Sequence, residues 1–246
     1  MLDMGFLPAI RRIVAALPRE RQTLCFSATL EASVANLVND YMNKPVRVAV
    51  GSISRPADTV ELQAFEVSHA EKSEVLRLLL HAEKGQTLVF ARTKHGTERL
   101  AKHLVRDGFA AAMIHGDRTQ SQRTGALSGF ENGKFQVLVA TDVASRGIHV
   151  NNVAHVINYD LPQIPEDFIH RVGRTGRMGS SGRASTLVSG AEIGELRLME
   201  RALKLKIARK QINARERVAP RTMQNSLATC TLSRMPGEVF SWQDAI

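Results

Sequence analysis

The sequence predicts an α/β fold with a doubly wound, mostly parallel sheet. Short apolar runs alternate with amphipathic stretches from residue 60 to about residue 205, an order that is typical of consecutive βαβ units. The chain has 246 residues, of which 43% are hydrophobic, so it can bury a sizeable core. Threonine, glycine and aspartate follow several predicted strands, where sheets of this kind bind their ligands.

Residues 1–50 are expected to form the end of a first domain rather than a whole one. Helices are expected at 6–17 and 31–42, where apolar residues recur at helical spacing, and short buried strands at 22–26 and 46–50. Strand, helix and strand follow each other as in a parallel sheet, but about 50 residues are too few to close one.

Residues 51–59 are rich in glycine, serine and proline and are expected to form an interdomain linker, with an ordinary surface loop as the alternative. Residues 60–206 are expected to form one complete domain. Its predicted strands span 62–67, 87–91, 110–114, 137–140, 153–157 and 184–188. Its predicted helices span 71–83, 97–106, 120–130 and 193–205, with one more after residue 164. Residues 207–246 begin basic and then lose periodicity, so we expect a loosely ordered tail.

Composition favours a polyanionic partner. The formal net charge is +9 and the sequence pI is about 10.1, values that suit nucleic acid or an anionic membrane surface. No apolar run approaches the length of a membrane span, and the N-terminus lacks a secretory pattern. Cys25 and Cys230 match no metal-binding spacing. We expect a cytoplasmic protein that does not enter the membrane.

An arginine-rich octet, HRVGRTGR at 170–177, is the strongest candidate for phosphate chemistry. Arginine is always charged, and its planar fork of donors matches a phosphate group. Arg171 and Arg174 are expected to share one helix face, and Gly176 is expected to end that helix and leave Arg177 on a turn. The alternative is a solvated basic helix, which the flanking glycines and His170 disfavour.

Other candidate residues follow predicted strands. Thr93 is placed to cap a helix, and the amides of a helix N-terminus bind phosphate. Gly116 would allow close approach of a sugar-phosphate backbone. A capping box at residues 119–122 accounts for Thr119 and Gln122, but it gives no structural reason for Arg123. Thr141 can donate a hydroxyl to a phosphate oxygen and Asp142 can brace a nearby arginine, with a plain helix cap as the alternative.

These motifs, in this order, resemble those of the DEAD-box RNA helicases. The matching segments are MLDMGF at 1–6, SAT at 27–29, the Gln-x-x-Arg pair at 120 and 123, TDVASRG at 141–147 and the octet at 170–177. The resemblance covers about residues 1–205. It implies the remnant of a first RecA-like, ATP-binding domain over 1–50 and a second RecA-like helicase domain over 60–206.

The resemblance also implies a role for each site residue. RNA contacts would come from Arg92, Thr93, Gly116, Arg123 and Thr141. Coupling of the ATP state to RNA would involve Ser27, Thr29, Asp142, Arg146, His170 and Arg171. ATP contacts would come from Gly147, His149, Arg174 and Arg177, with Arg174 and Arg177 catalytic and Arg177 as an arginine finger. His149 stands where the family has an aspartate that holds the ATP ribose.

Two family motifs do not occur in the sequence. There is no Gly-x-x-x-x-Gly-Lys-[Ser/Thr] loop and no Asp-Glu-x-Asp, so most of the site for ATP and Mg²⁺ is missing. We therefore expect the C-terminal portion of an ATP-dependent RNA helicase that unwinds short duplexes, inactive without an N-terminal RecA-like lobe. RNA would be held mainly through its sugar-phosphate backbone. The alternatives are a non-catalytic RNA-binding or partner-binding module, and a DNA-translocating relative.

Overall fold

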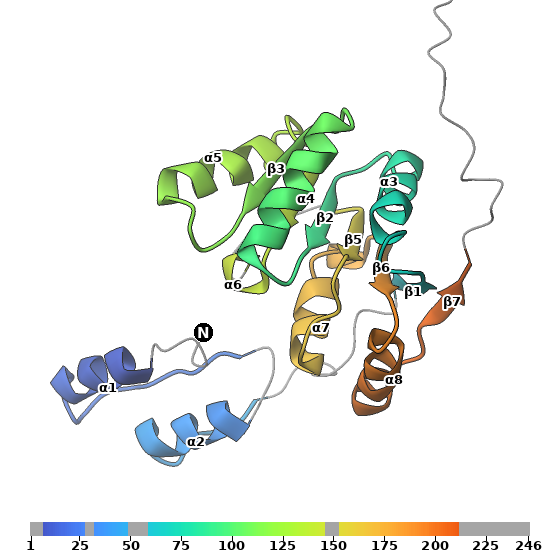
Figure 1. Cartoon of the computed structure of the whole chain (residues 1–246). Helices are drawn as coiled ribbons and strands as arrows, with labels where there is room; N and C mark the ends of the chain where they lie inside the picture. Colours follow the sequence, from blue (N-terminus) through green and yellow to red (C-terminus); the bar gives the residue numbers. More distant parts are fainter. Residues whose placement is uncertain (1–6, 28–31, 49–58, 146–152, 212–246) are drawn as a thin grey trace, which may run out of the picture. The chain divides into compact units, whose positions relative to one another are not determined.

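The structure is a computed structural model, and it describes residues 7–27, 32–48, 59–145 and 153–211 (Figure 1). The predictions for Thr29, Arg146, Gly147 and His149 lie outside the described residues, as do those for nearly all of the linker and the tail beyond residue 211. Among the described residues, no helix is both long and apolar enough to cross a membrane.

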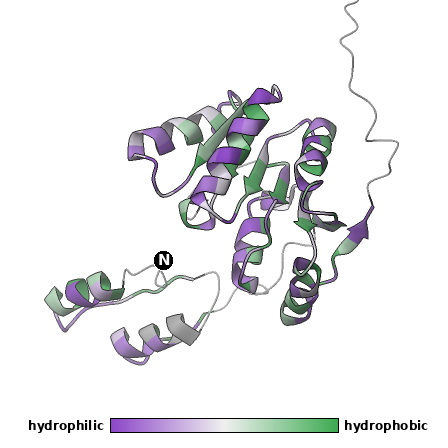
Figure 2. Ribbon diagram, viewed as in Figure 1, coloured by the Kyte–Doolittle hydropathy of each residue, from purple (hydrophilic) through white to green (hydrophobic). Residues whose placement is uncertain are grey.

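A seven-stranded sheet with the order β3-β4-β2-β5-β6-β1-β7 forms the centre of the domain from residue 59 onward. The strands are β1 (Val60–Glu66), β2 (Thr87–Phe90), β3 (Ala111–Ile114), β4 (Val137–Ala140), β5 (His155–Asn158), β6 (Gly182–Val188) and β7 (Ala208–Lys210). Neighbouring strands of this sheet all pair in parallel, which confirms the predicted fold class. The residues of β2, β4 and β5 are all buried, and the strands are mainly apolar in Figure 2.

Helices cover both faces of this sheet. They are α3 (Lys72–Ala82), α4 (Lys94–Arg106), α5 (Gln120–Glu131), α6 (Asp142–Ser145), α7 (Pro165–Val172) and α8 (Glu192–Leu203). Along β2, Leu88 and Phe90 join the core that includes residues of α5, α7 and α8, whereas Val89 packs with α3 and α4. Because successive side chains of a strand point to opposite faces, these two cores lie on opposite sides of the sheet.

The sheet extends beyond the predicted boundary at residue 206. Strand β7 pairs in parallel with β1 over Gln63–Phe65, and Ile207 just before it is buried in the core. All three residues of β7 are exposed, and two of them are basic, so no apolar run marked the strand in the sequence.

The N-terminal part forms helices α1 (Leu7–Ala16) and α2 (Ala32–Tyr41), close to their predicted bounds. The predicted strand at 22–26 is wrong in this structure, because residues 21–27 carry no strand. Of the strand predicted at 46–50, residues 46–48 carry no strand, and residues 49–50 lie outside the described residues. A strand is stable only when neighbours satisfy its backbone groups, and no described strand pairs with these segments. Their apolar side chains consequently stay exposed, with Phe26 at 89% and Val46 at 90%.

Candidate nucleic-acid interface

The carboxyl ends of neighbouring strands β3, β4 and β2 bring the phosphate-binding candidates together. A hollow of about 400 Å³ is lined by Arg92, Thr93, Lys94, His95, Gly116, Thr141 and Val143. Four of the five residues predicted to contact RNA lie in this set. We call this hollow the groove. Its position follows from the parallel topology, because the carboxyl ends of parallel strands meet at one edge.

Local backbone preferences shape the groove. Thr93 caps α4 as predicted, because its hydroxyl accepts a hydrogen bond from the Gly96 amide at 3.0 Å. A Cβ at Gly116 would lie 3.3 Å from Cε of Lys94, a tight contact, so glycine keeps this wall open beside Lys94. Lys94 donates to the Asp117 carboxylate at 2.5 Å across the rim.

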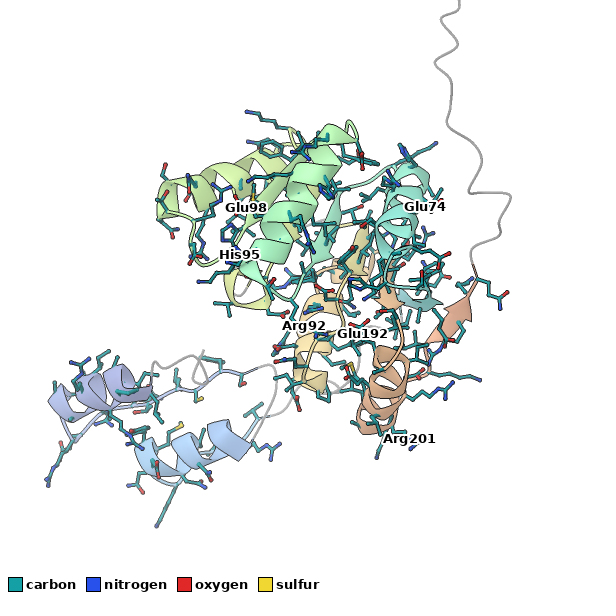
Figure 3. The ribbon with its side chains drawn as sticks, in the orientation of Figure 1. Glu74, Arg92, His95, Glu98, Glu192 and Arg201 are labelled. Carbon is teal, nitrogen blue, oxygen red and sulfur yellow. The ribbon has the colours of Figure 1, made fainter. Side chains whose placement is uncertain are left out.

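Arg92 is held at the edge of the groove by a buried ion pair (Figure 3). Its Nη2 lies 3.3 Å from Oε1 of Glu192, and Nζ of Lys72 donates to Oε2 of the same carboxylate at 2.7 Å. The Lys72 side chain is only 1% exposed. Burial by itself raises the pKa of Glu192, but the hydrogen bond and charge of Lys72 outweigh that effect and lower it. The Arg92 amide also donates to Asp160 at 2.8 Å.

Sequence reasoning missed the residues that support Arg92. Lys72 and Glu192 are separated by 120 positions, and neither follows a motif that predicts their pairing. One local signal was available: Ser189 and Glu192 have the spacing of a capping box, and the Ser189 amide donates to Glu192 at 3.1 Å. That signal predicts the start of α8 but not the contact with Lys72.

Arg123 lies beside the groove rather than in its lining. The predicted capping box at the start of α5 is present, with the Thr119 hydroxyl accepting from the Gln122 amide at 3.3 Å. Arg123 follows on the first turn and donates from Nη2 to the carbonyl of Ala144 at 3.4 Å. Its Nε is buried without a hydrogen-bond partner among the described residues. Helix α6, which Arg123 contacts, begins directly after Thr141.

Asp142 braces an arginine, as the sequence indicated, and that arginine is Arg171. Nε donates to Oδ1 at 2.5 Å and Nη2 to Oδ2 at 2.7 Å, a bidentate pair. Nη1 donates to the Asp160 carbonyl at 2.7 Å and to Oδ1 of Asn158 at 3.2 Å. The guanidinium also lies 5.0 Å from the centre of the Phe90 ring. The arginine is therefore buried but fully satisfied.

The predicted geometry of the arginine octet is partly wrong. Helix α7 ends at Val172, capped by Gly173, so Arg171 and Arg174 do not share a helix face. Gly176 has a φ of 67° and precedes a short 3₁₀ turn, Arg177–Gly179, rather than ending α7. The helix ends early at Gly173, which caps it, while the Arg171 side chain turns inward to its acceptors.

Arg174 and Arg177 follow the end of α7 and interact electrostatically. Burial, followed by the charge of Arg177, lowers the pKa of Arg174. Nε of Arg177 donates to the Gly173 carbonyl at 2.9 Å, which holds its stem against the end of α7. Two guanidinium groups in one partly buried place favour an anion such as phosphate, which relieves their repulsion.

The other described candidates for coupling are His170 and Ser27. His170 is on α7, with Nδ1 3.8 Å from a carboxylate oxygen of Asp167. Ser27 is exposed in the N-terminal part. Among the described residues, no group of three or more histidine, cysteine or acidic side chains could hold a metal ion.

Comparison with known proteins finds helicases that resemble this chain. The model of the helicase conserved C-terminal domain matches residues 70–179. The DEAD-box ATP-dependent RNA helicase CshA of Geobacillus kaustophilus is 39% identical over 257 residues, which cover 100% of this chain and 55% of the relative. The chain thus spans about half the length of this curated relative.

Two solved structures share the fold. A DEAD box protein from Methanococcus jannaschii is 41% identical with a TM-score of 0.60, over 87% of this chain and 57% of that one. Dbp5 of S. cerevisiae, bound to RNA and ADP BeF3, is 28% identical with a TM-score of 0.79, over 86% of this chain and 57% of that one.

Proposed function

The chain belongs to the DEAD-box family of RNA helicases and carries their C-terminal RecA-like domain, and from this premise we propose that it acts as the second lobe of an ATP-dependent enzyme that separates short RNA duplexes. In this role the domain binds the RNA backbone in the groove and supplies arginines to ATP held by an N-terminal RecA-like lobe.

One observation carries the RNA part of the proposal. Arg92, Thr93, Gly116 and Thr141 come from three loops, yet they line one hollow. They offer a cation, the amides of a capped helix, an open backbone and a hydroxyl, all of which suit phosphate and sugar rather than base edges. Sequence specificity should therefore be low. The buried Nε of Arg123, which has no described partner, provides a further donor beside the groove.

The ATP part rests on Arg174 and Arg177. Their two guanidinium groups, one of them with a pKa lowered by burial, suit the phosphates that become more charged as hydrolysis proceeds. Arg177 then acts as the arginine finger. The described residues fit ATP phosphates but offer no ligand cluster for Mg²⁺. We assign the Mg²⁺ site to the N-terminal lobe.

The test is to fuse this chain to the N-terminal lobe of a DEAD-box relative. We expect ATP hydrolysis that RNA stimulates, and separation of a short duplex. Arg177→Ala should abolish hydrolysis while leaving RNA binding intact, and Arg123→Gln should weaken RNA binding. The chain alone should hydrolyse no ATP. A fusion that binds RNA as before but never hydrolyses ATP, whether Arg177 is present or not, would instead support a non-catalytic RNA-binding module.

A further inference from the structure

The outer side of α4 carries a row of basic side chains that begins at the groove. The buried side of the helix is apolar apart from Thr97 and packs against the sheet. On the opposite, exposed side lie His95, Arg99, Lys102 and Arg106, at positions i, i+4, i+7 and i+11. At about 100° per residue, these four positions fall within an arc of about 60°. They form a straight line along the helix, which we call the α4 row.

Two members of the α4 row have no acidic partner among the described residues. Lys102 pairs with Glu98 at 2.9 Å, but no ion pair of Arg99 or Arg106 occurs in the described part of the chain. Exposed arginines without a paired acid keep a positive potential that attracts an anion. Three acids reduce the charge of the row: Glu98 lines the same hollow, Asp117 acts on His95 and pairs with Lys94, and Asp107 follows Arg106 and pairs with Arg77.

The α4 row is continuous with the groove. A second hollow, of about 260 Å³, is lined by His95, Glu98, Arg99, Lys102, His103 and Arg106, and it shares His95 with the groove. Every lining residue of the second hollow is charged or is a histidine. A ligand that lies in the groove and extends past His95 therefore meets a polar surface on which three of six lining residues are arginine or lysine.

We propose that the α4 row binds the phosphates of a single-stranded RNA segment that continues beyond the groove. From His95 to Arg106 the helix rises about 17 Å, with successive cations about 4.5 to 6 Å apart along the axis. A regular line of cations matches a regular line of phosphates, whereas an acidic peptide would present charges of irregular spacing. The α4 row thus lengthens the RNA site without adding base specificity. This inference rests on the proposed function, because it takes the groove as the starting point of the RNA.

The test compares two lengths of fluorescent oligouridylate, about 4 and about 16 nucleotides, bound by the full chain over a range of salt. The double substitution Arg99→Gln and Arg106→Gln removes two phosphate contacts. With the longer RNA, the slope of log K against log salt should fall by about 1.4, and affinity near 0.1 M salt should drop about 20-fold. With the shorter RNA, the affinity should stay within about two-fold of that of the unsubstituted chain, and the slope of log K against log salt should hardly change.

The matched control is Arg197→Gln with Arg201→Gln on α8. These arginines are also exposed on one helix at i, i+4 spacing, and Arg201 lies far from His95 in Figure 3. The control changes net charge by the same amount and should leave the binding of both RNAs nearly unchanged. If the α4 variant matched this control with the longer RNA, the inference would be overturned.

A third variant separates failure of this inference from failure of the proposed function. Arg123→Gln, a substitution beside the groove, should weaken the binding of both the shorter and the longer RNA. If it weakens both while the α4 variant weakens neither, the groove binds RNA and the α4 row does not. If it weakens neither, the groove itself is not an RNA site, and the proposed function fails with it.

Discussion

Replacing Asp142 by asparagine would leave the buried Arg171 guanidinium without its counter-charge. The substitution keeps the shape of the side chain but removes the negative charge that accepts two hydrogen bonds, at 2.5 and 2.7 Å. Breaking one partner of a buried pair costs about 3–5 kcal/mol. Here two other acceptors and the Phe90 ring remain, and the Asp142 side chain is 26% exposed. We therefore expect a loss near the lower bound, about 2–3 kcal/mol.

Urea unfolding followed by circular dichroism measures this loss. With a slope of about 2 kcal/mol/M, the midpoint should fall by about 1–1.5 M. The control is Asp117→Asn, which breaks the pair with Lys94, where both side chains are more than half exposed. Exposed pairs contribute about 0–1 kcal/mol, so this midpoint should hardly move.

A double-mutant cycle decides whether the ion pair is the cause. Arg171→Met removes the buried charge and keeps most of the volume, so Asp142→Asn should cost much less in that background than alone. If Asp142→Asn costs the same with Met as with Arg at position 171, its effect does not act through the guanidinium, and the reasoning is refuted.

Three further predictions concern stability. Burial lowers the pKa of His155 to about 4, so its neutral form stabilises the fold fully above about pH 6.5 and less as pH falls toward 4. The chain should lose about 2 kcal/mol between pH 7 and pH 5 in urea titrations, and His155→Gln should lose clearly less over the same range. A Cβ at Gly182 would lie 2.6 Å from the Gly176 amide nitrogen, so Gly182→Ala should cost about 1–3 kcal/mol, whereas Gly194→Ala, in open space on α8, should not destabilise. Thr93→Ala should cost about 1 kcal/mol through loss of the α4 cap and Thr93→Ser much less, and equal midpoints for the two variants would contradict the capping role.

The regular βα part of the fold was predictable because its signals are local. Apolar runs such as Val137–Ala140 become fully buried strands, and the caps at Thr93 and Thr119 are side chain-to-backbone contacts over three residues. The groove followed from the same pattern, since each candidate stands at the end of a predicted strand. β7 was not predictable, because its pairing with β1 joins residues more than 140 positions apart, and its three residues are exposed and two of them are basic.

In both errors, at the end of α7 and at residues 22–26, the local structure depends on tertiary contacts that are either present or absent. At the end of α7, helical spacing predicted that Arg171 and Arg174 would point the same way, but acceptors from β5 and α6 turn Arg171 inward and the helix ends at Val172. At residues 22–26 the apolar run is a typical strand sequence, but strand geometry needs a neighbour, and none is present among the described residues.

The Asp142–Arg171 pair also gives a physical basis for the proposed coupling. Thr141 in the groove directly precedes Asp142, and Arg174 follows Arg171 by three residues, so one bidentate contact ties the proposed RNA site to the proposed ATP-phosphate site. A bidentate pair fixes direction as well as distance, so a shift of α7 that repositions Arg174 must either carry Asp142 with it or break both hydrogen bonds. Because breaking them is costly in a buried place, the shift should instead be transmitted to Thr141. On this reasoning, Asp142→Asn in the fused enzyme should weaken the stimulation of ATP hydrolysis by RNA more than it weakens RNA binding itself. Equal losses in both would indicate that the pair only stabilises the fold.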